Sequence, residues 1–153
     1  MKYILSLILA CLLLFSCAFA EETDFCAVTY GDSGKAVSVF AECIGYDGKI
    51  IQDMLFDDSV LNCLLRFQEE NGLEASGCFD LETLCYIFGI DYVSGDKDIV
   101  WIPMNGGKKY HAKPECSNMI EPRQVHIECV SALELDACKK CYKLQDIKTD
   151  PEG

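Results

Sequence analysis

The chain has 153 residues and a formal net charge of −12 at pH 7. Carboxylates in such excess repel phosphates, so we expect no nucleic-acid partner. Most of the acidic residues lie in residues 21–98, which carry 17 acidic and 4 basic residues. Residues 101–143 carry 5 acidic and 7 basic residues. The change in charge falls at a polar, turn-forming segment around 94–98 and predicts two modules, residues 21–95 and 96–143.

The beginning of the chain predicts a secretory signal peptide, residues 1–20. Lys2 precedes an apolar run over residues 4–19, which is short for a membrane span, and a small-x-small cleavage site ends at Ala20. We therefore expect cleavage after Ala20, a secreted or envelope-associated protein, and no transmembrane span in the mature chain. A loose lipoprotein box that ends at Cys17 leaves lipidation there as an alternative.

Residues 60–73 contain the clearest helix of the N-terminal module. Apolar residues recur there at i, i+3, i+4 and i+7, at the positions Val60, Cys63, Leu64 and Phe67. Ser59 is the predicted N-cap, and Asn71-Gly72 predicts the end of the helix.

Two shorter helices flank this one. Residues 35–44 show helical spacing and end at Gly45, and residues 81–88 follow Asp80, the predicted N-cap, and end at Gly89. Three helices joined by tight turns predict a mainly α, three-helix bundle for the N-terminal module.

The same module carries the residues of a known family. Those residues are Phe67-Gln68, Asn71-Gly72-Leu73, Gly77 and Thr83-Leu84. They resemble the second half of a peptidoglycan-binding-like domain, and the match covers about residues 31–89. The resemblance implies a three-helix fold and peptidoglycan as the ligand. For Gln68 it leaves two roles open, a contact with the ligand or a hydrogen bond to the following turn.

The C-terminal module begins with extended chain. Residues 99–103 are apolar, residues 105–107 form a strong turn, and residues 108–111 return from it, which predicts a hairpin. Residues 121–129 are a strand or a lead-in, and a helix is predicted over residues 131–137.

Four residues of this module have the spacing of metal ligands. His111 and Cys116 form H-x4-C, and Cys138 and Cys141 form C-x2-C after a gap of 21 residues. Two close pairs of nitrogen and sulfur donors suit tetrahedral zinc, and four protein ligands without an open position are typical of a structural site. Disulfides among these cysteines and a redox-active C-x-x-C are the alternatives.

The cysteine count bears on this choice. Nine cysteines follow the signal peptide, an odd number, so disulfides within the chain cannot use them all. Zinc would take three and leave an even six, whose pairing the sequence does not give: Cys26, Cys43, Cys63, Cys78, Cys85 and Cys129.

The C-terminal module also resembles a small Cys/His module found at the C-termini of exported and envelope proteins of Gram-positive bacteria, clostridial types especially. The matching residues are Trp101-Ile102-Pro103, Gly107 to His111, Cys116 to Met119, Pro122-Arg123, Val125 and the Cys138–Cys141 pair. The resemblance implies a small, zinc-ribbon-like α+β module. Residues 144–153 are a polar tail that we expect to be disordered.

No catalytic set emerges, because no nucleophile has an upstream base and no motif places a pair of carboxylates, so we expect no enzyme. We predict a non-catalytic exported protein that binds peptidoglycan or another cell-wall polymer and carries a structural zinc module. An envelope protein-interaction or regulatory module with the helical domain as a scaffold is the alternative, and a thiol–disulfide protein is a third hypothesis.

Five lysines of the C-terminal module either contact anionic wall polymers or form a solvated face: Lys108, Lys109, Lys113, Lys139 and Lys140.

Overall fold

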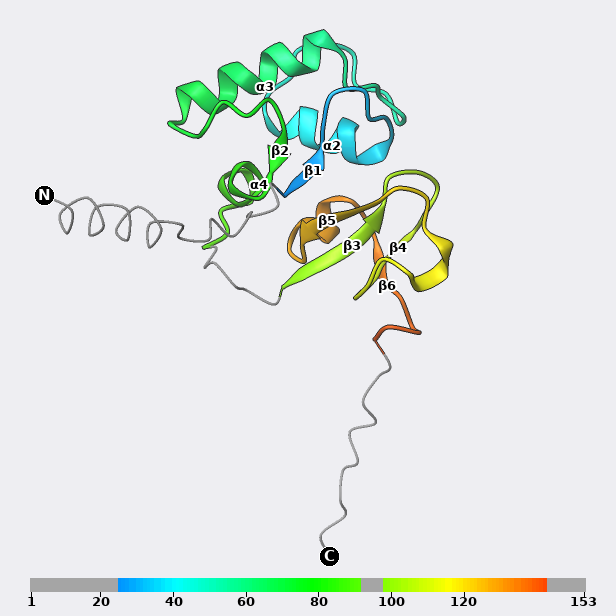
Figure 1. The fold of residues 1–153 in the computed structure, drawn as a ribbon. Helices are drawn as coiled ribbons and strands as arrows, with labels where there is room; N and C mark the ends of the chain where they lie inside the picture. Colours follow the sequence, from blue (N-terminus) through cyan, green and yellow to red (C-terminus); the bar gives the residue numbers. More distant parts are fainter. Residues whose placement is uncertain (1–24, 92–97, 143–153) are drawn as a thin grey trace, which may run out of the picture.

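The structure is a computed structural model that describes residues 25–91 and 98–142 (Figure 1). The predicted signal peptide with its alternative lipidation site, the border between the two modules and the polar tail lie outside the described residues. None of the described helices is long and apolar enough to cross a membrane.

The N-terminal half contains the three predicted helices and a small sheet. The helices are α2 (Lys35–Cys43), α3 (Asp58–Glu70) and α4 (Leu81–Phe88). Strands β1 (Cys26–Val28) and β2 (Phe79–Asp80) pair antiparallel between them. The predicted mainly α three-helix bundle is therefore wrong, since the helices are short and the chain as a whole mixes helices with several small sheets. Strands of two or three residues have too few positions to show an alternating pattern, and the sequence indicates only a short extended lead-in at residues 26–30, where β1 lies.

A disulfide joins β1 to the residue that precedes β2. Cys26 and Cys78 are bonded across a sequence separation of 52 residues, with their Cα atoms 5.9 Å apart. The register places Cys26 opposite Asp80 and Val28 opposite Phe79. The start of the half is thereby held against the turn that leads into α4.

Side chains and glycine fix the helix ends. Asp57, rather than the predicted Ser59, caps α3, and its carboxylate accepts a hydrogen bond from the Ser59 amide at 2.9 Å. Asp80 caps α4 as predicted, because its carboxylate accepts from the Thr83 amide at 2.8 Å. Gly89 then ends α4 in the left-handed conformation that glycine adopts most easily.

The C-terminal half is built on two further two-stranded sheets. Strand β3 (Ile99–Pro103) pairs antiparallel with β5 (Pro122–His126), which confirms a strand within the predicted segment 121–129. Strand β4 (Lys109–Tyr110) pairs parallel with β6 (Asp136–Ala137). The parallel pair brings the residues after β4 beside those after β6.

Of two further sequence predictions in this half, one is confirmed and one is wrong. Trp101 and His111 exchange two backbone hydrogen bonds of 2.8 Å, so the chain returns beside β3 as the hairpin prediction required. The helix predicted over 131–137 is wrong, because α5 (Cys129–Ala132) begins earlier and ends sooner. Glu134 then adopts φ +53, a left-handed conformation that is unusual outside glycine. Because the residue there is glutamate and not glycine, the sequence does not signal where α5 ends.

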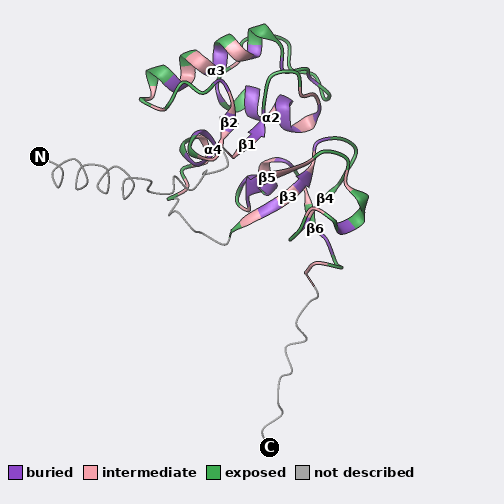
Figure 2. Cartoon of the chain, viewed as in Figure 1, coloured by how far each residue is buried: buried purple, intermediate pink, exposed green. Residues whose placement is uncertain are grey.

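One hydrophobic core runs through both halves (Figure 2). Strand β5 contacts β1 and α4 across the junction. The buried side chains of Phe40 and Phe79 belong to the same cluster as Val100 and Val125. The C-terminal half therefore folds against the helical half and does not depend on its own few apolar residues alone.

Candidate metal centre

The four predicted ligands come together at the parallel β4–β6 pair. His111 follows β4 directly, and Cys138 follows β6 directly. The backbone amide of Cys138 donates to the carbonyl of Tyr110 at 3.0 Å. This hydrogen bond places Cys138 beside the end of β4, where His111 follows. Cys116 opens the short 3-10 segment η1 (Cys116–Asn118).

Tight turns shape both pairs of the pattern. After Cys138 the chain folds back, and the amides of Cys141 and Tyr142 donate to the Cys138 carbonyl at 3.0 and 2.9 Å. After Cys116 the backbone enters the left-handed region, with φ +68 at Ser117 and +50 at Asn118. The turn after Cys138 keeps Cys138 and Cys141 close to each other, and the chain turns sharply just after Cys116.

The ligand atoms converge on one point. One donor atom from each of His111, Cys116, Cys138 and Cys141 lies within 4.8 Å of the other three. Cys116 Sγ and Cys138 Sγ are 3.8 Å apart, and Cys141 Sγ is 3.9 Å from His111 Nδ1. These four side chains could therefore hold a metal ion.

The centre is largely shielded from water. His111 is 4%, Cys116 9% and Cys138 3% exposed. Burial, followed by the charge of Lys109, lowers the pKa of His111 and favours the neutral imidazole that binds metal. The Cys141 backbone N–H lowers the pKa of Cys138 to about 7, whereas burial raises the pKa of the Cys141 thiol.

Gln68, the other predicted site residue, lies far inside the helical half. Its side chain is 0% exposed. Its amide nitrogen contacts Ser76 Oγ at 3.1 Å, the Cys78 carbonyl at 3.0 Å and Thr83 Oγ1 at 2.9 Å, and its oxygen accepts from the Gly77 amide at 3.1 Å. Of the two roles left open, this geometry supports the hydrogen bond to the following turn. The ligand role stays a prediction, to which the burial lends no support.

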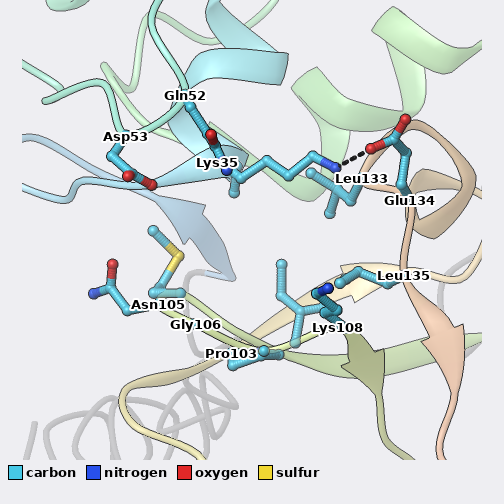
Figure 3. A pocket seen from close by; sticks show the side chains of 14 residues that line it. Lys35, Gln52, Asp53, Pro103, Asn105, Gly106, Lys108, Leu133, Glu134 and Leu135 are labelled. Carbon is cyan, nitrogen blue, oxygen red and sulfur yellow. Dashed lines mark hydrogen bonds and ion pairs between the residues drawn. The ribbon is translucent and has the colours of Figure 1, made fainter.

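A groove between the halves is a feature that the sequence analysis did not find. It has a volume of about 460 Å³ and is lined by the start of α2, residues 52–53, residues 102–108 and residues 133–135 (Figure 3). Lys35 and Glu134 form an ion pair from opposite halves on its wall. Four separate segments contribute to this inter-half groove, so no local pattern could reveal it. Among its lining residues, only Lys108 was predicted from the sequence as a possible contact with a wall polymer.

Comparisons of the chain with protein-family models, with curated proteins and with solved structures found no match. The resemblances to a peptidoglycan-binding-like domain and to the Cys/His module therefore stay predictions.

Proposed function

We propose that the chain is a non-catalytic exported binding protein whose C-terminal half is held by a structural zinc ion on His111, Cys116, Cys138 and Cys141. The convergence of their donor atoms within 4.8 Å carries this proposal. Tetrahedral ligands on bonds of about 2.3 Å lie about 3.8 Å from one another. The 3.8 Å between Cys116 Sγ and Cys138 Sγ and the 3.9 Å between Cys141 Sγ and His111 Nδ1 fit that geometry.

The donor set favours zinc over other common ions. Three thiols and an imidazole are soft or borderline donors, whereas calcium and magnesium take oxygen ligands. Four protein donors fill a tetrahedral shell and leave no position for a reacting water, which is the pattern of a structural site. The ion would tie together three segments, after β4, at η1 and after β6.

The zinc assignment is tested by metal analysis of the purified mature chain and two variants. Cys138→Ser removes a ligand, and we expect the zinc content to fall well below one per chain. Cys43→Ser removes an exposed thiol outside the centre and should leave the zinc content unchanged. Equal zinc content in both variants, or none in the unaltered chain, would contradict the assignment.

In this proposal the inter-half groove, rather than Gln68, contacts a cell-wall polymer. Peptidoglycan offers sugar hydroxyls and peptide groups, which need hydrogen-bonding partners beside apolar surface. Gln52, Asp53 and Asn105 supply such partners in the groove, and Pro103 and Leu135 supply the apolar surface (Figure 3). The volume of about 460 Å³ lies in the range of small-ligand sites.

Sedimentation with purified peptidoglycan tests this binding. We expect the mature chain to sediment with the polymer at low and moderate salt, and a double variant, Asp53→Ala with Asn105→Ala, to sediment at least several-fold less. Glu74→Ala is the matched control, since Glu74 is exposed and does not line the groove. A chain that stays in the supernatant would refute wall binding, and equal sedimentation of all variants would refute the groove as its contact.

Exposed apolar side chains favour the alternative, an envelope protein partner. Tyr30 is 55% and Leu55 53% exposed. Their segments are neighbours, since the Gly31 amide donates to the Phe56 carbonyl at 2.9 Å. Exposed apolar side chains on neighbouring segments favour a contact with another protein. Failure to sediment with peptidoglycan, together with cross-linking to an envelope protein that Leu55→Ser abolishes, would support this alternative.

A further inference from the structure

We propose that the lysines around the metal centre bind a polyanionic, phosphodiester-linked polymer of the cell wall. These residues form the lysine cluster: Lys108, Lys109, Lys113, Lys139 and Lys140. The proposal deepens the wall binding proposed above and rests on the export of the chain to the wall. It adds a second contact, chemically distinct from the inter-half groove, whose failure can be measured separately.

The fold brings lysines from distant parts of the sequence to one place. Lys109 and Lys113 lie two residues before and two residues after His111. A second pair of lysines fills the turn between Cys138 and Cys141. Because the donor atoms of these ligands lie within 4.8 Å of one another, both pairs flank a single centre. The parallel pairing of β4 with β6 holds the two segments side by side (Figure 1).

The lysine cluster is exposed and unpaired. All five of its side chains are exposed. Among the described residues the ion pairs are Lys35–Glu134 and Arg123–Asp32, and neither involves the cluster. The chain has 25 acidic residues that could offset these lysines, yet like charges gather here. Gathered like charges repel one another and cost stability, so their accumulation favours a partner outside the chain.

Balancing the charge of the metal centre is the competing role for these lysines. A zinc ion with three thiolates and a neutral imidazole carries a charge of −1, since two positive charges meet three negative ones. Residues 108–116 and 136–141 carry five lysines against two acidic residues, Glu115 and Asp136, which leaves a charge of +3. After the centre is balanced, a charge of +2 therefore remains for an anionic partner.

The chemistry of lysine indicates the kind of anion. Each ammonium is a compact, hydrated point charge on a flexible stem, whereas arginine binds an anion through a rigid fork of N–H groups. The one arginine within residues 98–142 is Arg123, and it already pairs with Asp32 at 3.1 Å. Several separate point charges suit successive phosphates along a flexible polymer better than they suit one small anion.

The rest of the protein directs such a polymer to the lysine cluster. Residues 21–98, with 17 acidic and 4 basic residues, repel it. Lys108 belongs both to the cluster and to the lining of the inter-half groove, so the two surfaces adjoin. A wall strand that enters the groove therefore meets the lysine cluster beside it.

An anionic membrane is the other polyanionic surface that an exported protein meets. Attachment to a membrane surface commonly uses an amphipathic helix whose apolar face enters the lipid. The described elements around the metal centre are β4, β6 and the three-residue segment η1, and none of them is such a helix. The structure therefore favours the polymer, and the membrane becomes a competing outcome of the test.

Sedimentation with two wall preparations tests the lysine cluster. One preparation keeps its phosphodiester polymer, and the other has been stripped of it by acid. We expect the mature chain to sediment several-fold more with the first, and this excess to disappear as salt is raised, because screening weakens exposed charge contacts. Equal sedimentation with both would overturn the proposal and leave binding to peptidoglycan intact. Sedimentation with the first preparation alone would refute the peptidoglycan contact and support the cluster.

Matched variants locate the contact, each with two positive charges removed. Lys108 is left unchanged because it also lines the groove. The two cluster variants and the control, whose altered residues are all exposed, are Lys109→Gln with Lys113→Gln, Lys139→Gln with Lys140→Gln, and Lys49→Gln with Arg66→Gln. We expect each cluster variant to lose most of the excess sedimentation and the control to keep it. A control that loses as much as the cluster variants would overturn the proposal.

Two further measurements exclude other causes. The zinc content shows whether each variant keeps its metal centre, and if the variant in the C-x2-C turn loses zinc, the Lys109 and Lys113 variant decides the test. Vesicles of phosphatidylglycerol and phosphatidylcholine are the membrane probe. We expect weaker binding to the vesicles than to the polymer at equal phosphate concentration and equal salt. Stronger binding to the vesicles would overturn the polymer as the partner of the cluster.

Discussion

Gln68 gives the sharpest test of how the helical half is held together. Its side chain is 0% exposed, and its two N–H groups and its oxygen all face buried or half-buried partners. Gln68→Met keeps the length and nearly the volume of the side chain but removes three hydrogen bonds. At about 1 kcal/mol for each bond, the variant should lose about 3 kcal/mol of unfolding free energy.

Urea denaturation followed by far-UV circular dichroism measures this loss. For a slope of about 1.5 kcal/mol per molar, the midpoint should fall by about 2 M. Gln52→Met is the matched control, because Gln52 is exposed, and its effect should stay within about 0.5 kcal/mol. A loss below about 1 kcal/mol for Gln68→Met would refute the structural role of the three hydrogen bonds. Gln68 would then again be a candidate for contact with a ligand.

Three further variants test the other interactions that hold the fold together, each by the same denaturation experiment. Asp80→Ala removes the cap of α4 and should cost about 1 kcal/mol, and an unchanged midpoint would contradict that role. Cys26→Ser with Cys78→Ser opens a loop of 52 residues, which corresponds to about 4 kcal/mol in chain entropy, and the loss should disappear when both proteins are compared under reductant. Arg123→Met leaves the half-buried Asp32 unpaired and should cost about 1–2 kcal/mol, whereas a coupling near zero in a double-mutant cycle with Asp32→Asn would contradict a tie between the halves.

The sequence predicted correctly those features of the fold that depend on residues close together in the chain. The helical spacing of residues 35–44 and 81–88, the Asp80 cap and the Gly89 stop depend on residues within a few positions of one another, and all are confirmed. The convergence of His111, Cys116, Cys138 and Cys141 was also predictable, because ligand spacing in a chain is a direct consequence of coordination geometry.

Features that depend on distant segments could not be read in this way. Strands β1 and β2 are too short to show alternation, and their pairing joins segments about 50 residues apart, next to the Cys26–Cys78 disulfide of sequence separation 52. The interior of α3 also departs from its periodicity, since the apolar Phe67 is half-buried while the polar Gln68 is fully buried. A satisfied amide can occupy a core position, and only the surrounding turn shows that its partners are present.

The central claim is that a zinc ion holds the C-terminal half, and one combined measurement tests it most directly. The intact mature protein is assayed for metal and for native thiol reactivity, before and after removal of metal by a strong chelator. We expect one zinc per chain, together with three further reactive thiols, those of Cys116, Cys138 and Cys141, once the ion has left. A protein without metal, whose Cys116 is linked to Cys138 or whose three thiols react at the outset, would contradict the claim.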